Sequence, residues 1–239
     1  MSKRNTKGFI IAICCVIIFP VVFAYIFLER LERPTLSIRT CLPYYGPKKP
    51  FVRTYKDKKI EDTLYHSIPS FRLVSHVGDT VTQSHLDGKV TIVDFFFTTC
   101  KTICVPMTDN MLVLQEHFYK DKAHIQLMSF TVDPETDSVA QLFRYAQDKG
   151  VNSLQWLLIT GNKVSLYQLA RLGFFISAEQ TGDGGPDDFI HDNHFVLIDR
   201  ERHIRGYYDG TSTAATEQLI KDAEKLLVSY TIPLKEEFQ

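Results

Sequence analysis

Apolar residues along this chain follow two periods, one typical of buried strands and one typical of amphipathic helices. Residues 90–97 form a nearly continuous run of β-branched and aromatic side chains, which predicts a strand buried on both faces. After it, Met107, Met111, Leu114 and Phe118 recur at helical spacing. The same criteria predict a strand over 125–132, a helix over 139–149 capped by residues 133–137, a strand over 156–160, a helix over 163–172, a hairpin of 195–198 and 204–208, and a helix over 214–228.

The order of these elements predicts the fold class. A β-α-β-α-β series, followed by a β-hairpin and a helix, gives an α/β sandwich with a mixed sheet. An edge strand over 68–73 precedes the series. Because two cysteines stand where the first helix should begin, the order resembles a thioredoxin-like fold with a mixed sheet flanked by helices. We therefore expect one thioredoxin-like domain over 66–232 and a C-terminal tail over 233–239, although a fold alone does not determine a function.

The N-terminal region predicts a membrane anchor. Residues 8–28 are uncharged and mostly apolar, and Lys3, Arg4 and Lys7 precede them. Such a run is long enough for one transmembrane helix, and the preceding positive charges place its N-terminus in the cytoplasm and the domain on the outer, periplasmic side. A cleaved signal peptide is the alternative, but the run is long and no small-x-small motif ends it. Lipidation of Cys14 fits the sequence less well than a cleaved signal peptide does, because the apolar run continues after Cys14. Tail and anchor together span residues 1–33.

Residues 34–65 are expected to form a linker between the anchor and the domain. They carry several prolines and charges and show no sustained hydrophobic period. Cys41, within this segment, is expected to be a solitary exposed thiol. A second polar, glycine-rich stretch, 180–188, interrupts the domain before the last hairpin.

Composition excludes some classes of function. A formal net charge of -1 gives no electrostatic case for binding nucleic acid. The five cysteines fall into three groups, namely Cys14 with Cys15, Cys41 alone, and Cys100 with Cys104. An extracellular scaffold held by disulfides would need more cysteines spread through the domain.

Cys100 and Cys104 are the strongest candidates for chemistry. If a helix begins at Cys100, positions i and i+4 lie on one face with their α-carbons roughly 6 Å apart. That separation permits either a disulfide or one soft metal ion held between two thiolates. A helix N-terminus also favours the thiolate. The alternative is that both cysteines are small core residues, but a strand-to-helix junction containing Lys101 and Thr102 is a poor place for inert packing.

A histidine is the expected third ligand. His191 and His194 both stand at the entrance of the last hairpin, and we favour His194 because it directly adjoins the apolar strand. The alternative is that both are loop residues with backbone partners. Two cysteines and a histidine form a soft donor set that suits Cu(I) and can hold Cu(II), with zinc as a competitor.

The chain resembles the Sco/SenC family of membrane-anchored copper proteins over about residues 66–230. The motifs that carry the resemblance are Phe95-Phe96-Phe97-Thr98-Thr99-Cys100-x-x-x-Cys104, Thr131-Val132-Asp133-Pro134-Glu135-x-Asp137, Trp156-x-x-x-Thr160-Gly161, His194-Phe195-Val196-Leu197-Ile198-Asp199 and Arg205-Gly206-Tyr207-Tyr208-Asp209-Gly210. The resemblance implies a thioredoxin-like fold and copper bound by Cys100, Cys104 and His194, with Asp133 beside the ligands tuning the site. It also implies a metallochaperone that helps to assemble the dinuclear copper site of cytochrome c oxidase, with the copper-receiving oxidase subunit as partner.

The sequence departs from the family pattern beside the thiols. The family usually has proline directly after each cysteine, whereas Lys101 follows Cys100 and Val105 precedes Pro106 here. Proline at a first helical turn only presets backbone geometry, so copper binding should survive. Lys101 favours the thiolate and could shift the balance toward thiol chemistry.

Two other functions fit the sequence. The first is a membrane-anchored thiol-disulfide oxidoreductase or peroxidase-like enzyme using only Cys100 and Cys104. Its usual dithiol has two intervening residues, whereas this pair has three. The second is a non-catalytic copper sensor, for which the sequence offers no signalling motif.

Overall fold

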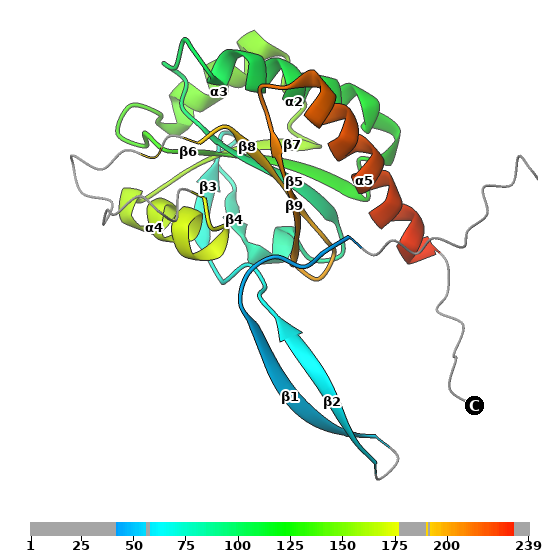
Figure 1. The fold of residues 1–239 in the computed structure, drawn as a ribbon. Coiled ribbons are helices and arrows are strands. Elements are labelled where there is room, and N and C mark those ends of the chain that lie inside the picture. The colour runs from blue at the N-terminus through cyan, green and yellow to red at the C-terminus, as the bar shows by residue number, and fades with distance from the viewer. Residues whose placement is uncertain (1–41, 56–57, 177–189, 191, 232–239) are drawn as a thin grey trace, which may run out of the picture. The chain divides into compact units, whose positions relative to one another are not determined.

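The structure, a computed structural model, describes residues 42–55, 58–176, 190 and 192–231 (Figure 1). The predicted membrane-spanning segment 8–28, the glycine-rich stretch 180–188 and His191 lie outside these residues, as do Cys14, Cys15 and Cys41. In the described part of the chain, no helix is long and apolar enough to cross a membrane. The chain from Leu42 onward forms one compact unit.

A mixed sheet forms the centre of this unit, as the sequence predicts. Its strands, among the described residues, are β3 (Arg72–Ser75), β4 (Thr80–Thr82), β5 (Val90–Phe96), β6 (Ile125–Thr131), β7 (Trp156–Thr160), β8 (His194–Ile198) and β9 (Ile204–Asp209). Their spatial order is β4-β3-β7-β6-β5-β8-β9, with β5, β6 and β7 parallel to one another. The strand β5 is buried along its whole length, which confirms the predicted buried strand for residues 90–96; Phe97 follows the strand and is partly buried.

Helices cover both faces of the sheet (Figure 1). The helices α2 (Cys104–His117), α3 (Val139–Lys149) and α5 (Thr213–Thr231) pack on one face, and α4 (Lys163–Gln168), which continues as a π-helical turn over Leu169–Gly173, packs on the other. Short 3-10 turns occupy Gln83–His85 and Tyr119–Asp121. Each face therefore buries its own apolar cluster, and the α/β sandwich is confirmed.

Two helix boundaries differ from the prediction. Ser138, not a residue of 133–137, caps α3 by accepting a hydrogen bond from the Gln141 amide at 3.3 Å. Gly150 ends α3 in the left-handed conformation, with φ at 76°. The helix α2 begins at Cys104 and not at Cys100, so the i, i+4 geometry expected of the two cysteines on one helix is wrong.

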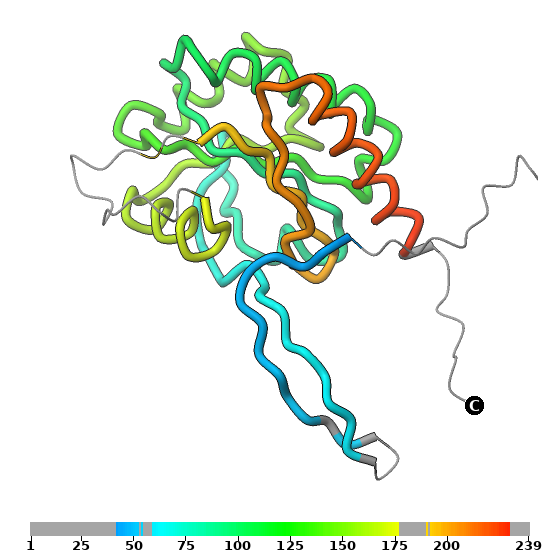
Figure 2. The backbone as a smooth tube through the Cα atoms, viewed as in Figure 1, coloured from blue at the N-terminus to red at the C-terminus, as the bar shows by residue number. Residues whose placement is uncertain are grey.

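Residues 34–65, predicted as a linker, contain regular structure. The strands β1 (Lys48–Tyr55) and β2 (Lys58–Tyr65) pair with each other as an antiparallel hairpin that belongs to a separate two-stranded sheet. The β1–β2 hairpin stands clear of the other elements in the smooth backbone trace (Figure 2). Because neither face of the hairpin packs on the core, its sequence lacks the hydrophobic period that marks the other strands. The edge strand expected over 68–73 begins only at Arg72.

Candidate functional site

The two candidate thiols stand in the loop that joins β5 to α2. After Phe96 the chain turns through Thr98 and Thr99, and the Cys100 amide donates to the Phe97 carbonyl at 3.2 Å. Both cysteines are free thiols, Cys100 partly exposed and Cys104 buried. The Cys100 sulfur contacts the Thr102 hydroxyl at 3.6 Å, and the two cysteine thiols lie close enough for each to shift the pKa of the other. The turn therefore brings together the pair that a continuous helix was expected to align.

The two thiols differ in acidity. Burial would raise the pKa of Cys100, but hydrogen bonds from the Cys104 thiol and from the backbone amides of Thr102 and Cys104 hold the pKa below its ordinary value. Burial raises the pKa of Cys104 to about 12, and the hydrogen bond with Cys100 adds to this effect. Cys100 is thus the partner that ionises first, and Cys104 keeps its proton at neutral pH.

This asymmetry predicts selective alkylation of the reduced, metal-free chain. At pH 8, iodoacetamide should modify Cys100 at least about 100-fold faster than Cys104, because reactivity follows the thiolate fraction and each pKa unit changes that fraction about tenfold. Raising the pH should reduce the difference between the two alkylation rates, since Cys104 gains thiolate as the pH approaches the raised pKa of its thiol. Mass spectrometry of the separate cysteine-containing peptides measures both rates. Equal rates at pH 8 would contradict the asymmetry.

A buried carboxylate holds the thiol loop in place. Asp137, fully buried, accepts hydrogen bonds from the Thr98 amide at 3.1 Å, from the Thr98 hydroxyl at 2.5 Å and from the Thr131 hydroxyl at 2.6 Å. Sequence reasoning selected Asp133 as the acidic residue near the ligands. In the structure the Asp133 carbonyl accepts from the Asp137 amide at 2.8 Å, and the carboxylate that reaches the thiol loop is that of Asp137. The signal that could have found it is the second acidic residue at the end of Asp133-Pro134-Glu135-Thr136-Asp137.

Two further polar residues lie beneath Cys104 and were not predicted. Asp94, on β5, is buried, its Oδ1 has no hydrogen-bond partner, and burial raises the pKa of its carboxyl to about 7. The Tyr145 hydroxyl lies 2.9 Å from the Thr108 hydroxyl of α2. The charges of Asp94 and Cys104 add to the burial that raises the pKa of Tyr145 to about 12, which places the three groups close together. A polar residue inside the apolar run 90–97 was the signal for Asp94.

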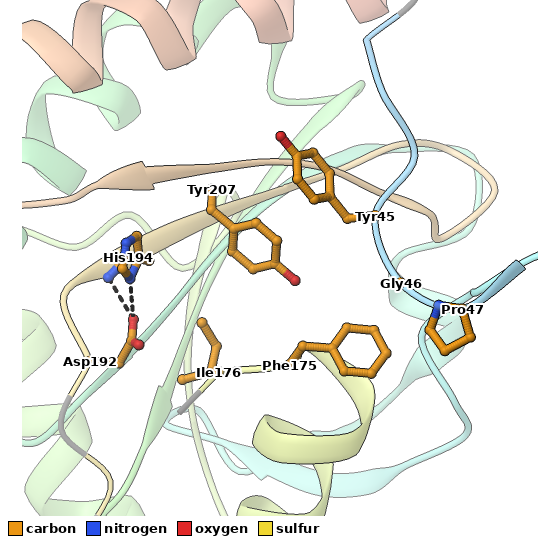
Figure 3. A pocket seen from close by; sticks show the side chains of 8 residues that line it. All are labelled: Tyr45, Gly46, Pro47, Phe175, Ile176, Asp192, His194 and Tyr207. Carbon is orange, nitrogen blue, oxygen red and sulfur yellow. Dashed lines mark hydrogen bonds and ion pairs between the residues drawn. The ribbon is translucent and has the colours of Figure 1, made fainter. Parts of the chain in front are cut away.

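His194, the predicted third ligand, lies apart from the thiols. Its side chain is on the same face of β8 as Val196, which belongs to the apolar cluster under α4, whereas Cys104 and Phe195 belong to the cluster under α2. Both its backbone amide and its Nδ1 contact Asp192 Oδ1, at 2.8 and 2.9 Å (Figure 3). The ring lines a pocket of about 410 Å³ together with Tyr45, Gly46, Pro47, Phe175, Ile176, Asp192 and Tyr207.

The structure thus brings together two of the three predicted ligands. Within the described residues, no group of three His, Cys, Asp or Glu side chains is arranged to hold a metal ion. Cys100 and Cys104 meet, and His194 does not join them. His191, the other histidine of the segment, lies outside the described residues.

A family model settles which group of proteins this chain belongs to. The model described as SCO1/SenC matches residues 60–228, which include the thiol loop, the sheet and the helices described above. The chain belongs to the SCO1/SenC family. Membership confirms the resemblance carried by the sequence motifs and agrees with the thioredoxin-like arrangement of the SCO1/SenC domain.

Solved members of the SCO1/SenC family share this fold. The chain is 31% identical to a SCO1/SenC family lipoprotein from Bacillus anthracis str. Ames, with a TM-score of 0.58 and coverage of 68% of this chain and 95% of that one. BsSco, described as a member of the Sco family of cytochrome c oxidase assembly proteins with a disulfide switch, is 28% identical at a TM-score of 0.57, covering 67% of this chain and 93% of its own. Yeast Sco1, solved with copper bound, is 21% identical at a TM-score of 0.54 over 71% of this chain and 92% of its own, and shows the fold alone.

Proposed function

We propose that this SCO1/SenC chain is a copper metallochaperone that binds one copper ion through Cys100, Cys104 and a histidine. We further propose that the predicted span 8–28 anchors the domain on the outer side of the membrane, and that the recipient of the copper is the dinuclear copper site of a cytochrome c oxidase subunit. The observation that carries the proposal is the pair of free, neighbouring thiols at the strand-to-helix junction of a SCO1/SenC domain.

The donor chemistry of the pair fits copper as cargo. Thiolates are soft ligands that favour Cu(I), and Cys100 is already poised toward the thiolate by its hydrogen bonds. Cys104 must lose its proton for the metal to bind, so copper binding should release a proton and tighten as pH rises. The partial exposure of Cys100 gives a donor protein access to the pair.

The identity of the histidine ligand is decided between His194 and His191. His194 was favoured from the sequence, but its Nδ1 is engaged by Asp192 and its ring lies on the α4 side of β8. Binding through His194 would therefore require the start of β8 to rearrange. This position weakens the case for His194 and leaves His191 as its alternative.

Copper binding by the full chain, reduced and purified in detergent, tests the proposal and its third ligand. We expect one copper per chain against a competing chelator. We also expect one of the two variants His191→Ala and His194→Ala to weaken the affinity by more than the roughly 10- to 100-fold that loss of an outer partner costs. His117→Ala is the control, because His117 contacts Glu224 at 2.9 Å near the far end of α2. Failure of the chain to retain copper would overturn the proposal, and unchanged affinity in both variants would exclude a histidine ligand.

A thiol-disulfide oxidoreductase is the second candidate function. The observation that favours it is the unequal pair, in which a partly exposed thiol of lowered pKa lies beside a buried thiol of raised pKa. In this case turnover of a disulfide substrate should need both cysteines and be indifferent to His191 and His194. A copper requirement for activity would exclude this alternative.

A further inference from the structure

In the described part of the chain, no other strand pairs with the β1–β2 hairpin. Its strands pair only with each other, from Lys48 opposite Tyr65 to Tyr55 opposite Lys58. The ribbon projects away from the sheet and helices (Figures 1 and 2). A hairpin of two strands is at best marginally stable alone in water, and its unpaired edges invite association. The hairpin therefore lacks the packing that stabilises every other strand of the domain.

The base of the hairpin is nevertheless fixed to the domain. The Tyr45 amide, just before β1, donates to the Ile204 carbonyl of β9 at 3.0 Å, and His66 Nε2, just after β2, contacts the Gly173 carbonyl oxygen at 2.8 Å. The hairpin is thus held at its base in a defined direction.

Large apolar side chains are exposed on the hairpin, and most share one face. The pairing register puts Phe51 on the same face as Ile60 and Leu64, together with Lys49 and with Asp62, which lies directly opposite Phe51, while Val52 lies on the opposite face. Phe51 is 43% exposed and Leu64 is 59% exposed. Exposed apolar side chains that gather on one surface mark interaction sites in soluble domains. The face of Phe51, Ile60 and Leu64, with its adjacent lysine, is the apolar-basic face of the hairpin.

The hairpin is basic although the rest of the domain is acidic. Residues 48–65 contain six Lys and Arg against three Asp and Glu, whereas residues 66–239 contain 15 against 23. Lys48, Lys49 and Lys59 are exposed. A concentration of positive charge on an otherwise negative chain is complementary to an anionic surface.

The length of the preceding chain indicates which surface lies within reach. Leu42 is fixed to the domain, since its carbonyl accepts from Arg205 Nη2 at 2.5 Å. Between residue 28, where the predicted span ends, and Leu42, 13 residues can bridge at most about 45 Å when fully extended. The hairpin begins six residues after Leu42. A membrane that holds this span would therefore lie at most about 45 Å from Leu42, within reach of the hairpin.

We propose that the β1–β2 hairpin docks on the membrane surface, with its apolar-basic face in the headgroup region and its lysines on the phosphates of anionic phospholipids. Docking of this kind combines buried apolar area with electrostatic attraction. Because the hairpin is fixed at its base, docking would set the orientation of the domain, and hence of the thiol loop, relative to the bilayer. The proposal depends on the predicted anchor and not on copper binding.

Fluorescence quenching in nanodiscs of brominated lipids tests this proposal with the full chain. The variant Phe51→Trp places a reporter on the apolar-basic face, and Phe143→Trp on α3 is a matched control, because both phenylalanines are 43% exposed. Trp156 is buried and contributes the same background to both. In discs that contain phosphatidylglycerol, we expect quenching and a blue shift for Phe51→Trp and neither for Phe143→Trp.

Charge reversal identifies the lipid contribution. Adding Lys48→Glu and Lys49→Glu to Phe51→Trp should lower the ratio of docked to free hairpin at least about tenfold, since each basic residue near an anionic surface contributes about fivefold. High salt, or discs of phosphatidylcholine alone, should have the same effect. Quenching of Phe51→Trp no greater than that of Phe143→Trp, or quenching indifferent to charge reversal, would overturn the proposal, as would failure of the chain to enter discs. Copper content, measured on the same samples, tests the proposed function separately.

Discussion

Replacing Cys104 by serine should abolish tight copper binding, with a loss of several orders of magnitude in affinity. Serine is nearly the same size, so the buried position at the start of α2 stays filled, but a hydroxyl does not ionise at neutral pH and is a hard ligand for Cu(I). Cys100→Ser should have a similar effect, because a single remaining thiolate cannot hold copper against a chelator. Competition with a Cu(I) chelator of known affinity measures each loss on the reduced full chain.

The control for these variants is Cys41→Ser, which makes the same substitution at the cysteine that the sequence predicts to be solitary. It should leave copper affinity unchanged. A third variant tests the interaction between the two thiols. Cys104→Ala, unlike Cys104→Ser, removes the donor that helps to lower the pKa of Cys100, so the Cys100 thiol of the alanine variant should need a higher pH for alkylation. Copper retained by Cys104→Ser would show that the pair is not the ligand set.

The elements that could be predicted from sequence are those with one buried face or two buried faces, because such burial leaves a regular apolar pattern along the chain. The strand β5 was predicted because both of its faces are buried, which leaves an unbroken apolar run. The helix α3 was predicted with its last residue because Gly150 adopts a left-handed conformation that ends a helix. The thiol pair was predicted because cysteines that follow such a strand stand at a reactive junction.

The remaining features depend on contacts that no local pattern records. Asp137 accepts a hydrogen bond from Thr98, which lies 39 residues earlier in the sequence. Only the folded structure brings the two loops together, so the sequence alone could not show that Asp137 holds the thiol loop. The start of α2 could not be predicted, because no side chain caps it and the preceding turn competes with a longer helix. His194 adjoins an apolar strand, as the prediction required, but the alternation of β8 turns its side chain away from the thiols.

The buried ion pair between Arg205 and Asp199 should be the largest single determinant of stability outside the apolar core. Arg205 is 6% exposed and Asp199 is 1% exposed, with 2.8 Å between Nη1 and Oδ2. The same guanidinium donates to the carbonyls of Leu42 and Pro43 and lies 4.0 Å from the centre of the Tyr44 ring. Arg205→Ala should therefore reduce the free energy of unfolding by about 3–5 kcal/mol, because it leaves the Asp199 carboxylate buried without its counter-charge. Urea denaturation of the detergent-solubilised chain, followed by the fluorescence of its single tryptophan, measures this change.

Two further variants separate the charge of Arg205 from its geometry. Arg205→Lys keeps a positive charge opposite Asp199, but an ammonium group cannot donate in the planar directions that reach Leu42 and Pro43, so its loss should be intermediate. Lys225→Ala removes the exposed partner of Asp222, at 2.7 Å, and should cost less than about 1 kcal/mol because exposed pairs are screened by solvent. Equal effects of Arg205→Ala and Lys225→Ala would show that burial of the ion pair adds nothing. Because Arg205 also holds the Leu42 carbonyl, Arg205→Ala should in addition expose residues 42–46 to hydrogen exchange before the strands of the sheet.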